Sequence, residues 1–507
     1  MCRIESIRSR LCNAYFIAGF LSILLSGLAA FSTSVINPDA ICYLQSAKTF
    51  PLGFMNAVHV CGQAAWPFYS MLIFGMVSIT HLSYTAAAYV LNGLFSLISV
   101  VTFIAIVRLF TISSRIIGLA AFIILFAHMF NDLRSEIIRD HGYWAFYLVS
   151  LFFFLRYWLS SERFYFAVLW GMALIAATLF RIEGAIFLLL LPLTAFFMPR
   201  LRVGARIHAF LQLNILTFIV IAFMIFWILL HPAYSFSRLN EVQFQFLHGI
   251  SELTKNYNLA SHALALHVLS VYSARDTGLI LFCMLVGWYI TNVIGNVSLI
   301  YAVLIGYAWY KRISPFKEMR VAVWMYIAVN ILITAVFLID HLFLAKRYLM
   351  ALSLVFMLWV PFALDDLLKQ WAVRKWPVIA AVFFIVIFGI SGVVHFGYSK
   401  QYIRDAGDWL AIHTREHAKI YSNDIQVLYY SNHFGNSIFA KADEFADIHK
   451  IANHQWQQYD YLALRTNKHH LAVNSPILDE IKQKPIVIFH NKRGDFVAIY
   501  QVHTNGS

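Results

Sequence analysis

Charged residues are scarce in this chain. Only 12% of its 507 residues are charged, whereas 61% are hydrophobic. About a quarter of the residues of a typical globular protein are charged. Most of this chain must therefore face lipid or other helices, which excludes an ordinary water-soluble globular protein.

The sequence also lacks the motifs of several functional classes. It has no P-loop, dinucleotide fingerprint, internal repeat or low-complexity tract. Its five cysteines show no metal-ligand spacing, and both a Cys42–Cys61 disulfide and two separate apolar thiols remain open. Much of the net charge of +13 falls in short clusters between apolar runs. A nucleic-acid binder carries its positive charge on one face or stripe, so we expect no nucleic-acid partner.

The apolar runs predict a polytopic α-helical membrane protein. The first, roughly 14–36, follows Arg3, Arg8 and Arg10 and is longer than the core of a signal peptide. We interpret it as an uncleaved span with a cytoplasmic N-terminus. If 67–79 is a re-entrant or interfacial helix on the outer side, every later loop agrees with the positive-inside rule, and the sequence predicts about eleven spans.

The remaining spans are expected between alternating loops. Six of them are expected at about 86–109, 116–130, 142–158, 210–230, 278–309 and 378–394. Two more are the apolar runs that meet at Arg181–Glu183, and the last two are the runs that end at Asp340 and at Asp365. The run 278–309 is long for one span and is expected to be tilted or broken near 292–296. This topology leaves the C-terminus outside.

Beyond Ser399 the composition becomes that of a soluble domain. We predict a transmembrane domain at 1–398, with its first outer loop at 37–85, and a small extracytoplasmic α/β domain at 399–507. An amphipathic helix is expected at 402–413. Strands are expected at 419–422, 459–464, 486–490 and 496–502, the last two joined by a turn containing Gly494.

A carboxylate stands directly after the first span, in the sequence Asn37-Pro38-Asp39-Ala40. Ionisable groups at a membrane boundary are costly to bury unpaired and tend to be functional. Asp39 is therefore a candidate general base, and its alternative role is to cap the first helix of the loop.

Further charged residues gather at the predicted outer ends of the spans. Asp140 is a candidate second acid, which either acts on a substrate or a metal or pairs with Arg139, and Glu136 is a rival acid one helical turn away. Arg181 and Glu183 suggest an internal ion pair. Lys346 and Arg347 suggest a phosphate site, or else snorkelling anchors. The histidines His59, His141 and His341 are expected to be polar loop residues, and His469-His470 a solvated pair.

Five short motifs together resemble the GT-C superfamily of membrane glycosyltransferases, especially its bacterial protein-mannosyltransferase-like and aminoarabinose-transferase-like members. The first is an acid followed by an aromatic residue and Ala, which matches Asp39, Tyr43 and Ala47. The others are Trp66-Pro67, Arg139-Asp140, Arg181-Ile182-Glu183-Gly184 and Lys346-Arg347-Tyr348-Leu349. Some relatives have a phosphate-binding Lys where this chain has Trp66, so other cations would have to bind the phosphate.

The resemblance implies an inverting glycosyltransferase of the bacterial inner membrane, with a periplasmic C-terminal domain. It would move a sugar from a polyprenyl-phosphate carrier to a lipid, glycan or protein acceptor on the outer face. Such a reaction needs a base for the acceptor hydroxyl and a cationic site for the leaving phosphate. The implied catalytic residues are Asp39 and Asp140, and the implied substrate-binding residues are Arg139, Arg181, Glu183, Lys346, Arg347 and Tyr348.

A transporter or a flippase for lipid-linked glycans is the alternative. Such proteins usually have paired segments broken at mid-membrane depth. Here the polar residues cluster at span ends, and Asn292 and Asn296 are the exceptions. The sequence predicts no certain cofactor and leaves a requirement for a divalent cation open.

Overall fold

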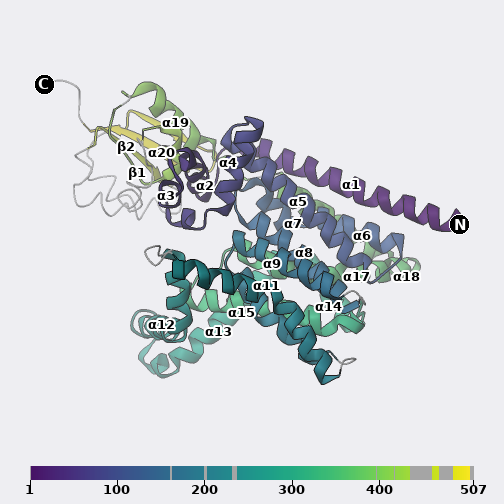
Figure 1. Ribbon diagram of the computed structural model, residues 1–507. Helices are drawn as coiled ribbons and strands as arrows, with labels where there is room; N and C mark the ends of the chain where they lie inside the picture. Colours follow the sequence, from purple (N-terminus) through teal and green to yellow (C-terminus); the bar gives the residue numbers. More distant parts are fainter. Residues whose placement is uncertain are drawn as a thin grey trace. The chain divides into compact units, whose positions relative to one another are not determined.

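The fold is described from a computed structural model of the chain. It describes residues 2–159, 163–198, 202–230, 237–394, 397–415, 417–433, 459–466 and 484–502. The chain divides into two compact units (Figure 1). The first comprises Met1–Leu28, Val90–Arg134 and Arg139–Val394, and the second comprises Ala29–Tyr89, Ser135–Ile138 and His395–Ser507.

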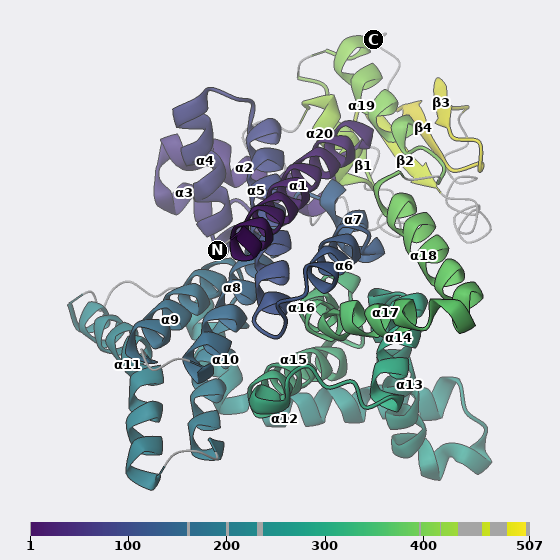
Figure 2. The ribbon, with the colours of Figure 1, turned by 90° about the vertical axis from the view of Figure 1, so that its right-hand side faces the viewer.

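The first unit is entirely helical within the described residues (Figure 2). Two of its helices, α1 and α5, extend into the second unit. Its α-helices are α1 (Cys2–Ser32), α5 (Tyr84–Arg108), α6 (Ser114–Leu125), α7 (His128–Asp132), α8 (Asp140–Leu159), α9 (Arg163–Phe180), α10 (Gly184–Leu190), α11 (Val203–Leu230), α12 (Ser237–His267), α13 (Thr277–Val297), α14 (Leu299–Tyr310), α15 (Arg320–His341), α16 (Lys346–Phe356), α17 (Val360–Lys369) and α18 (Trp371–Val393). Short 3-10 helices follow some of them: η3 (Leu133–Ser135), η4 (Leu191–Phe197), η5 (Val271–Asp276), η6 (Lys317–Met319) and η7 (Met357–Trp359).

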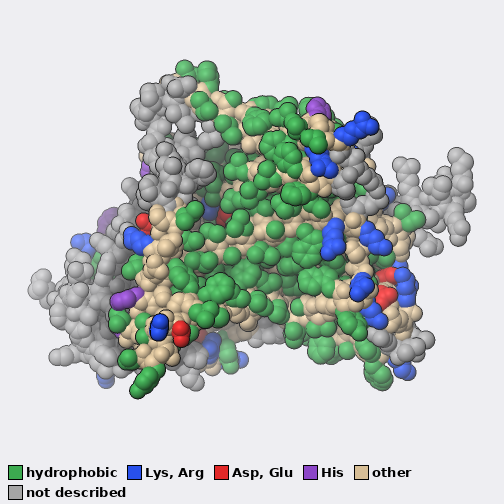
Figure 3. Space-filling view, turned by 90° about the horizontal axis from the view of Figure 1, so that it is seen from below, with side chains coloured by type: hydrophobic (Ala, Val, Ile, Leu, Met, Phe, Trp, Pro, Cys, Tyr) green, Lys and Arg blue, Asp and Glu red, His purple; other side chains and the backbone are tan. Residues whose placement is uncertain are grey.

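Among the described residues, eight helical segments are long and apolar enough to cross a membrane. They are Asn13–Ser32, Tyr84–Arg108, Arg163–Phe180, Val203–Phe223, Val271–Val297, Arg320–His341, Lys346–Lys369 and Lys375–Val393. A ninth results if Ser114–Leu125 and His128–Ser135, which are bent by 50°, form one span. The face in Figure 3 is covered largely by hydrophobic side chains, as expected of a surface that meets lipid. The chain is a multi-pass membrane protein.

The structure differs from the predicted count of spans. The expected fourth and sixth spans form α8 and α10–η4, which are not among these candidates. The apolar segment Gly184–Phe197, which combines α10 and η4, is among the shorter apolar helices. The long run 278–309 was expected to be tilted or broken near 292–296. It is broken at Ser298, between α13 and α14. By length and composition alone, eight or nine of the described segments are therefore candidate spans.

The second unit contains the predicted first loop. Its helices here are α2 (Pro38–Thr49), η1 (Phe50–Leu52), α3 (Phe54–Val58), η2 (Gly62–Ala65) and α4 (Phe68–Thr80). A Cys42–Cys61 disulfide, with Cα atoms 6.0 Å apart, joins α2 to the residue before η2. Helix α4 has 13 residues and is about 20 Å long, which is too short to cross a bilayer upright.

The same unit contains a four-stranded sheet in the order β1-β2-β4-β3. Its elements are α19 (Gln401–His413), β1 (Ile420–Ser422), α20 (Ile425–Ser431), β2 (Tyr461–Thr466), β3 (Val487–His490) and β4 (Phe496–Gln501). Strand β1 is parallel to β2, and β4 is antiparallel to both β2 and β3. The predicted helix, strands and Gly494 hairpin turn are confirmed, since Gly494 has φ 95° and Asn491 N donates to Asp495 O over 2.9 Å.

Candidate active site

Arg181 is the centre of a buried charged cluster in the first unit. It lies in the short connection between α9 and α10 and is only 8% exposed. Its Nη1 donates to Asp140 Oδ1 over 2.5 Å, and its Nη2 donates to Glu183 Oε1. The predicted Arg181–Glu183 ion pair is therefore confirmed. The hydrogen-bonded partner of Asp140 is Arg181, whereas the sequence suggested its neighbour Arg139.

Tyr348 connects this ion pair to the late motif. The guanidinium carbon of Arg181 lies 4.5 Å from the centre of the Tyr348 ring, and that of Arg347 lies 5.4 Å from it. Aromatic faces attract guanidinium groups electrostatically, more strongly where water is excluded. Motifs more than 160 residues apart in sequence thus meet at one aromatic ring.

The charges of the cluster leave it positive. Burial raises the pKa of Asp140, but Arg181, Arg347 and Arg139 together lower it below its usual value. Burial likewise raises the pKa of Glu183, and Arg181, by charge and hydrogen bond, lowers it overall. Both carboxylates are therefore ionised at neutral pH. Three guanidinium groups face two carboxylates, so the cluster favours an added anion over an added cation.

Two glycines allow the chain to come close enough to build this cluster. A Cβ atom at Gly184 would lie 2.7 Å from Thr178 Oγ1 and 2.8 Å from Thr178 N. A Cβ atom at Gly142 would overlap the ring of Phe180. The first close approach holds α10 against the end of α9, and the second packs the start of α8 there. Asp140 and Arg181 are brought together in this way.

Lys346 and Arg347 begin α16 but have different surroundings. Lys346 is exposed, and its carbonyl oxygen accepts a hydrogen bond from Asn296 Nδ2 over 2.7 Å. Arg347 is half-buried and close enough to Asp140 to lower its pKa. Of these two cations, Arg347 is therefore the one that lies in the Arg181 cluster.

Asp39 belongs to the second unit. Helix α2 begins at Pro38, so its N-cap is Asn37 and Asp39 lies in the first turn. The alternative that Asp39 is the N-cap residue is therefore wrong. The carboxylate is half-buried and its Oδ1 accepts a hydrogen bond from Gln63 Nε2 over 2.8 Å.

The start of α2 is fixed by hydrogen bonds within this unit. Asn37 Nδ2 donates to Ile137 O over 3.3 Å, and Asn37 Oδ1 accepts from Ile137 N over 2.8 Å. Tyr430 OH accepts from Ile36 N over 3.0 Å, and Gln426 Nε2 donates to Ile36 O over 2.5 Å. The chain before Asp39 is thus held by α20 and by the segment that leads to Arg139.

The other residues of the first motif pack the loop. Tyr43 and Ala47 are buried in α2, and Tyr43 meets the Tyr69 ring edge-on with centroids 5.2 Å apart. Trp66-Pro67 leads directly into α4. The contact between Tyr43 and Tyr69 therefore packs α2 against α4.

Several lesser candidates are placed differently from expectation. Glu136 precedes α8 in a non-helical segment, so it does not share a helix face with Asp140. His141 is buried in α8, with Nε2 3.0 Å from Leu133 O, and is not a loop residue. His341 ends α15 and stacks on Phe337, so it is not a loop residue either. His59 is an exposed turn residue after α3, as expected, and its Nδ1 lies 2.7 Å from Met55 O. The pair His469-His470 lies outside the described residues.

Sequence reasoning missed a row of buried polar groups behind the cluster. Tyr143 lies 5.9 Å from the Arg181 guanidinium, and Tyr147 OH accepts from Asn330 Nδ2 over 2.5 Å. Tyr326 OH accepts from Trp170 Nε1 over 3.0 Å. Asp140, Tyr143 and Tyr147 are three and four residues apart, which places them on one face of a helix. This spacing could have indicated from the sequence that the two tyrosines lie beside Asp140.

No three His, Cys, Asp or Glu side chains gather as a metal site in the part of the chain that the structure describes. Asp140 and Glu183 are already paired with Arg181. A divalent cation therefore fits this cluster poorly.

Comparison with known proteins identifies the fold. No family model matches the sequence, and no curated protein matches it. Among solved structures, ArnT from Cupriavidus metallidurans in the apo state is similar at 12% identity and a TM-score of 0.51, over 99% of each chain. The same protein bound to undecaprenyl phosphate gives 12% identity and a TM-score of 0.50, over 96% of this chain and 97% of that one.

An archaeal structure shares the fold as well. The oligosaccharyltransferase AglB from Archaeoglobus fulgidus, in complex with an inhibitory peptide and a dolichol-phosphate, is similar at 12% identity and a TM-score of 0.51. The similarity covers 96% of this chain and 74% of that one. The chain therefore shares the fold of ArnT and of AglB over nearly its whole length.

Proposed function

We propose that the protein is an inverting glycosyltransferase that moves a sugar from a polyprenyl-phosphate carrier to an acceptor on the outer face of the membrane. The observation that carries the proposal is the Arg181 cluster, a buried group of charges with an excess of guanidinium groups, within a GT-C fold. Solved structures with this fold include ArnT bound to undecaprenyl phosphate and AglB with a dolichol-phosphate. These complexes support a polyprenyl-phosphate donor.

The cluster would hold the phosphate of the carrier. The bond between the anomeric carbon and the phosphate oxygen breaks, and the departing phosphate keeps the electron pair. Arg347 would bind this phosphate, because its planar fork can donate two parallel hydrogen bonds to phosphate oxygens. Lys346 would assist from the exposed side, and Arg181, Arg139 and Tyr348 would position Arg347 and keep the region positive.

The acceptor would attack the opposite face of the anomeric carbon, which inverts its configuration. Asp39 would accept the proton of the acceptor hydroxyl as general base. Its half-burial and its hydrogen bond from Gln63 orient the carboxylate. Asp140 would act mainly by fixing Arg181 and Arg347, a positioning role that revises the expectation of direct contact with the acceptor.

The proposal also covers the sugar, the acceptor and the membrane in which the protein lies. The donor would be a hexosyl or pentosyl polyprenyl phosphate, and the acceptor a lipid, glycan or protein. We place the protein in a bacterial inner membrane, with a cytoplasmic N-terminus and a periplasmic C-terminal domain. A divalent cation, if one is needed, would accompany the donor, since the carboxylates of the cluster are already paired.

Purified full-length protein in detergent provides the test. It is incubated with short-chain polyprenyl-phosphate sugars and a mixture of envelope lipids, glycans and peptides, with and without a chelator. Release of polyprenyl phosphate together with a glycosylated acceptor of inverted anomeric configuration supports the proposal. Movement of an intact lipid-linked glycan across vesicle membranes, with no bond cleaved, would support the flippase alternative instead.

A further inference from the structure

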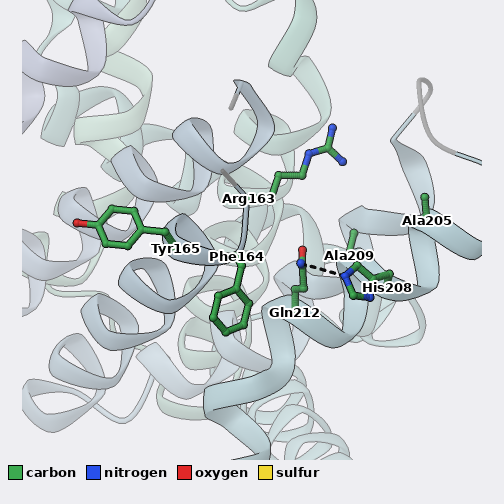
Figure 4. A pocket seen from close by; sticks show the side chains of 7 residues that line it. All are labelled: Arg163, Phe164, Tyr165, Ala205, His208, Ala209 and Gln212. Carbon is green, nitrogen blue, oxygen red and sulfur yellow. Dashed lines mark hydrogen bonds between the residues drawn. The ribbon is translucent and has the colours of Figure 1, made fainter. Parts of the chain in front are cut away.

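A cavity in the first unit lies away from the Arg181 cluster, between the start of α9 and the first three turns of α11. Its volume is ≈ 630 Å³, and the side chains that line it include Arg163, Phe164, Tyr165, His208 and Gln212 (Figure 4). Pockets of a few hundred cubic ångströms are typical for small ligands. None of the five residues belongs to the motifs that suggested the glycosyltransferase.

A chain of hydrogen bonds that starts at Tyr157 orients two polar side chains of this cavity, Gln212 and His208. Tyr157 OH donates to Gln212 Oε1 over 3.2 Å, and Gln212 Nε2 lies 3.1 Å from His208 Nε2. The amide nitrogen of Gln212 can only donate, so His208 Nε2 accepts and the ring proton is at Nδ1. His208 thereby presents an N–H donor.

Arg163 supplies the charge. It is the first residue of α9, is half-buried, and lines the cavity together with His208 and Gln212. Figure 4 shows Arg163 on one helix, and His208 and Gln212 adjacent on the other. A helix N-terminus also favours negative charge through its dipole. The N–H donor of His208 and the positive charge of Arg163 together favour an anion as the ligand of this cavity.

Apolar side chains around the cavity show that the anion is part of an amphipathic molecule. Phe164 and Tyr165, which line the cavity, are 52% and 58% exposed. Both α9 and α11 contain candidate membrane spans, so these exposed side chains face the space that acyl chains fill. A free phosphate ion would make no use of this apolar surface.

The charge pattern of the sequence places this end of the two helices in the cytoplasm. Arg156, Arg163, Arg202 and Arg206 all belong to the ends of the predicted inner loops. Basic pockets between transmembrane helices on the cytoplasmic side bind the head groups of anionic lipids. We propose that this cavity binds the phosphate of an anionic phospholipid, with Arg163 and His208 as the headgroup ligands.

Binding can be located and measured with the full-length protein in detergent. A photoactivatable phosphatidylglycerol should crosslink to peptides of α9 or α11, and phosphatidylcholine with the same photoreactive chain should crosslink less. Native mass spectrometry with short-chain phosphatidylglycerol then measures the affinity. Arg163→Gln should weaken it about fivefold, the effect of one cation near a charged lipid surface. His208→Ala should also weaken it.

Lys311→Gln is the matched control, because it removes a positive charge from another predicted inner loop without lining the cavity. Its affinity should equal that of the wild type, and the thermal unfolding midpoints of all variants should agree. The proposal is overturned if phosphatidylcholine crosslinks equally well, if Arg163→Gln and His208→Ala both bind like the wild type, or if inorganic phosphate alone displaces the lipid at millimolar concentration.

Discussion

The guanidinium carbon of Arg181 lies 4.5 Å from the ring centre of Tyr348, the residue that follows Arg347. Because Arg181 is also paired with Asp140 and Glu183, the ring connects two carboxylates to the second guanidinium. Arg347 is therefore held in place by groups that are themselves fixed. This leads to predictions that separate binding of the carrier from the structural role of the cluster.

Replacement of Arg347 should impair use of the donor. Arg347→Lys keeps the charge but loses the two directed hydrogen bonds, and Arg347→Ala also removes the charge. We expect turnover to fall by a factor of about a hundred or more in the Ala variant, and by less in the Lys variant. Initial rates with a short-chain polyprenyl-phosphate sugar measure both effects, and equilibrium binding of the same donor measures affinity.

Lys346→Ala is the matched comparison for Arg347→Ala. Lys346 is the exposed neighbour at the start of the same helix, so its loss should reduce turnover less. If Arg347→Ala binds and turns over the donor like the wild type, Arg347 is only an interfacial anchor. The carrier phosphate would then have to bind at Arg181 or Arg139.

Replacement of Asp39 by Asn should abolish transfer while leaving the protein folded in the membrane. The amide keeps the shape of the side chain and can still contact Gln63, but it does not accept a proton at neutral pH. For a hydroxyl acceptor we expect a loss on the order of a hundredfold or more. Asp276→Asn, at an exposed position of a predicted outer loop, should have no effect.

Near-normal transfer by Asp39→Asn to a hydroxyl acceptor would remove the base role from this residue. Its helix-capping role is already excluded by the position of Asn37. An acceptor that attacks through an ionised phosphate needs no base, so the acceptor class must be identified before the variant is compared.

Local signals predicted much of this molecule, because they depend on short stretches of sequence. Apolar length gave most of the membrane helices, and the alternation around Gly494 gave the β3–β4 hairpin. The Arg181–Glu183 pair was also predictable, since only one residue separates the two.

Long-range contacts were not predictable in the same way. Nothing near Asp140 in sequence indicates Arg181 as its partner, because that contact depends on how α8 packs against α9. The role of Tyr348 likewise depends on α16 meeting α8. Glu136 was misplaced because helical spacing was assumed before the start of α8, which the structure puts at Asp140.

The Arg181 ion pairs should contribute to stability in a pH-dependent way. Arg181→Gln leaves Asp140 and Glu183 without their guanidinium partner, and loss of one partner of a buried ion pair costs about 3–5 kcal/mol. Arg404→Gln breaks an exposed pair with Asp408 and should cost about 0–1 kcal/mol. Thermal unfolding of both variants in detergent at pH 7 gives the comparison.

The sign of the pH effect follows from the lowered pKa values of Asp140 and Glu183. Their contribution is present above the unfolded pKa values near 4 and is lost as the pH falls through the lower folded values. The difference in stability to unfolding between the wild type and Arg181→Gln should therefore become smaller as the pH is lowered from 7 through about 4. A gap that stays constant over that range would mean that the ion pairs do not stabilise the fold.

The C-terminus should lie outside the cytoplasm. The positive-inside pattern, with a cytoplasmic N-terminus and the eleven spans predicted from the sequence, requires this. A reporter that is active only in the cytoplasm, joined after Thr504, should be silent, and the same reporter joined after Lys311 should be active. Strong activity of the Thr504 fusion would overturn the topology, and with it the outer location of Asp39.

The glycine at position 184 should be needed to form the cluster. In Gly184→Ala the new Cβ atom would lie 2.7 Å from Thr178 Oγ1 and 2.8 Å from Thr178 N. Backbone atoms of a packed helix cannot yield as a flexible side chain can, so α10 must move away from α9. Arg181 and Glu183 lie in the connection that would shift, and we expect donor turnover to fall at least tenfold, since small displacements of positioned groups are costly.

Gly287→Ala is the matched control, because no atom lies within 4 Å of its Cβ position in α13. That variant should keep full activity and gain slightly in stability, because Ala is the better helix former by up to about 1 kcal/mol. If both variants are fully active, close packing of α10 against α9 is not what positions Arg181.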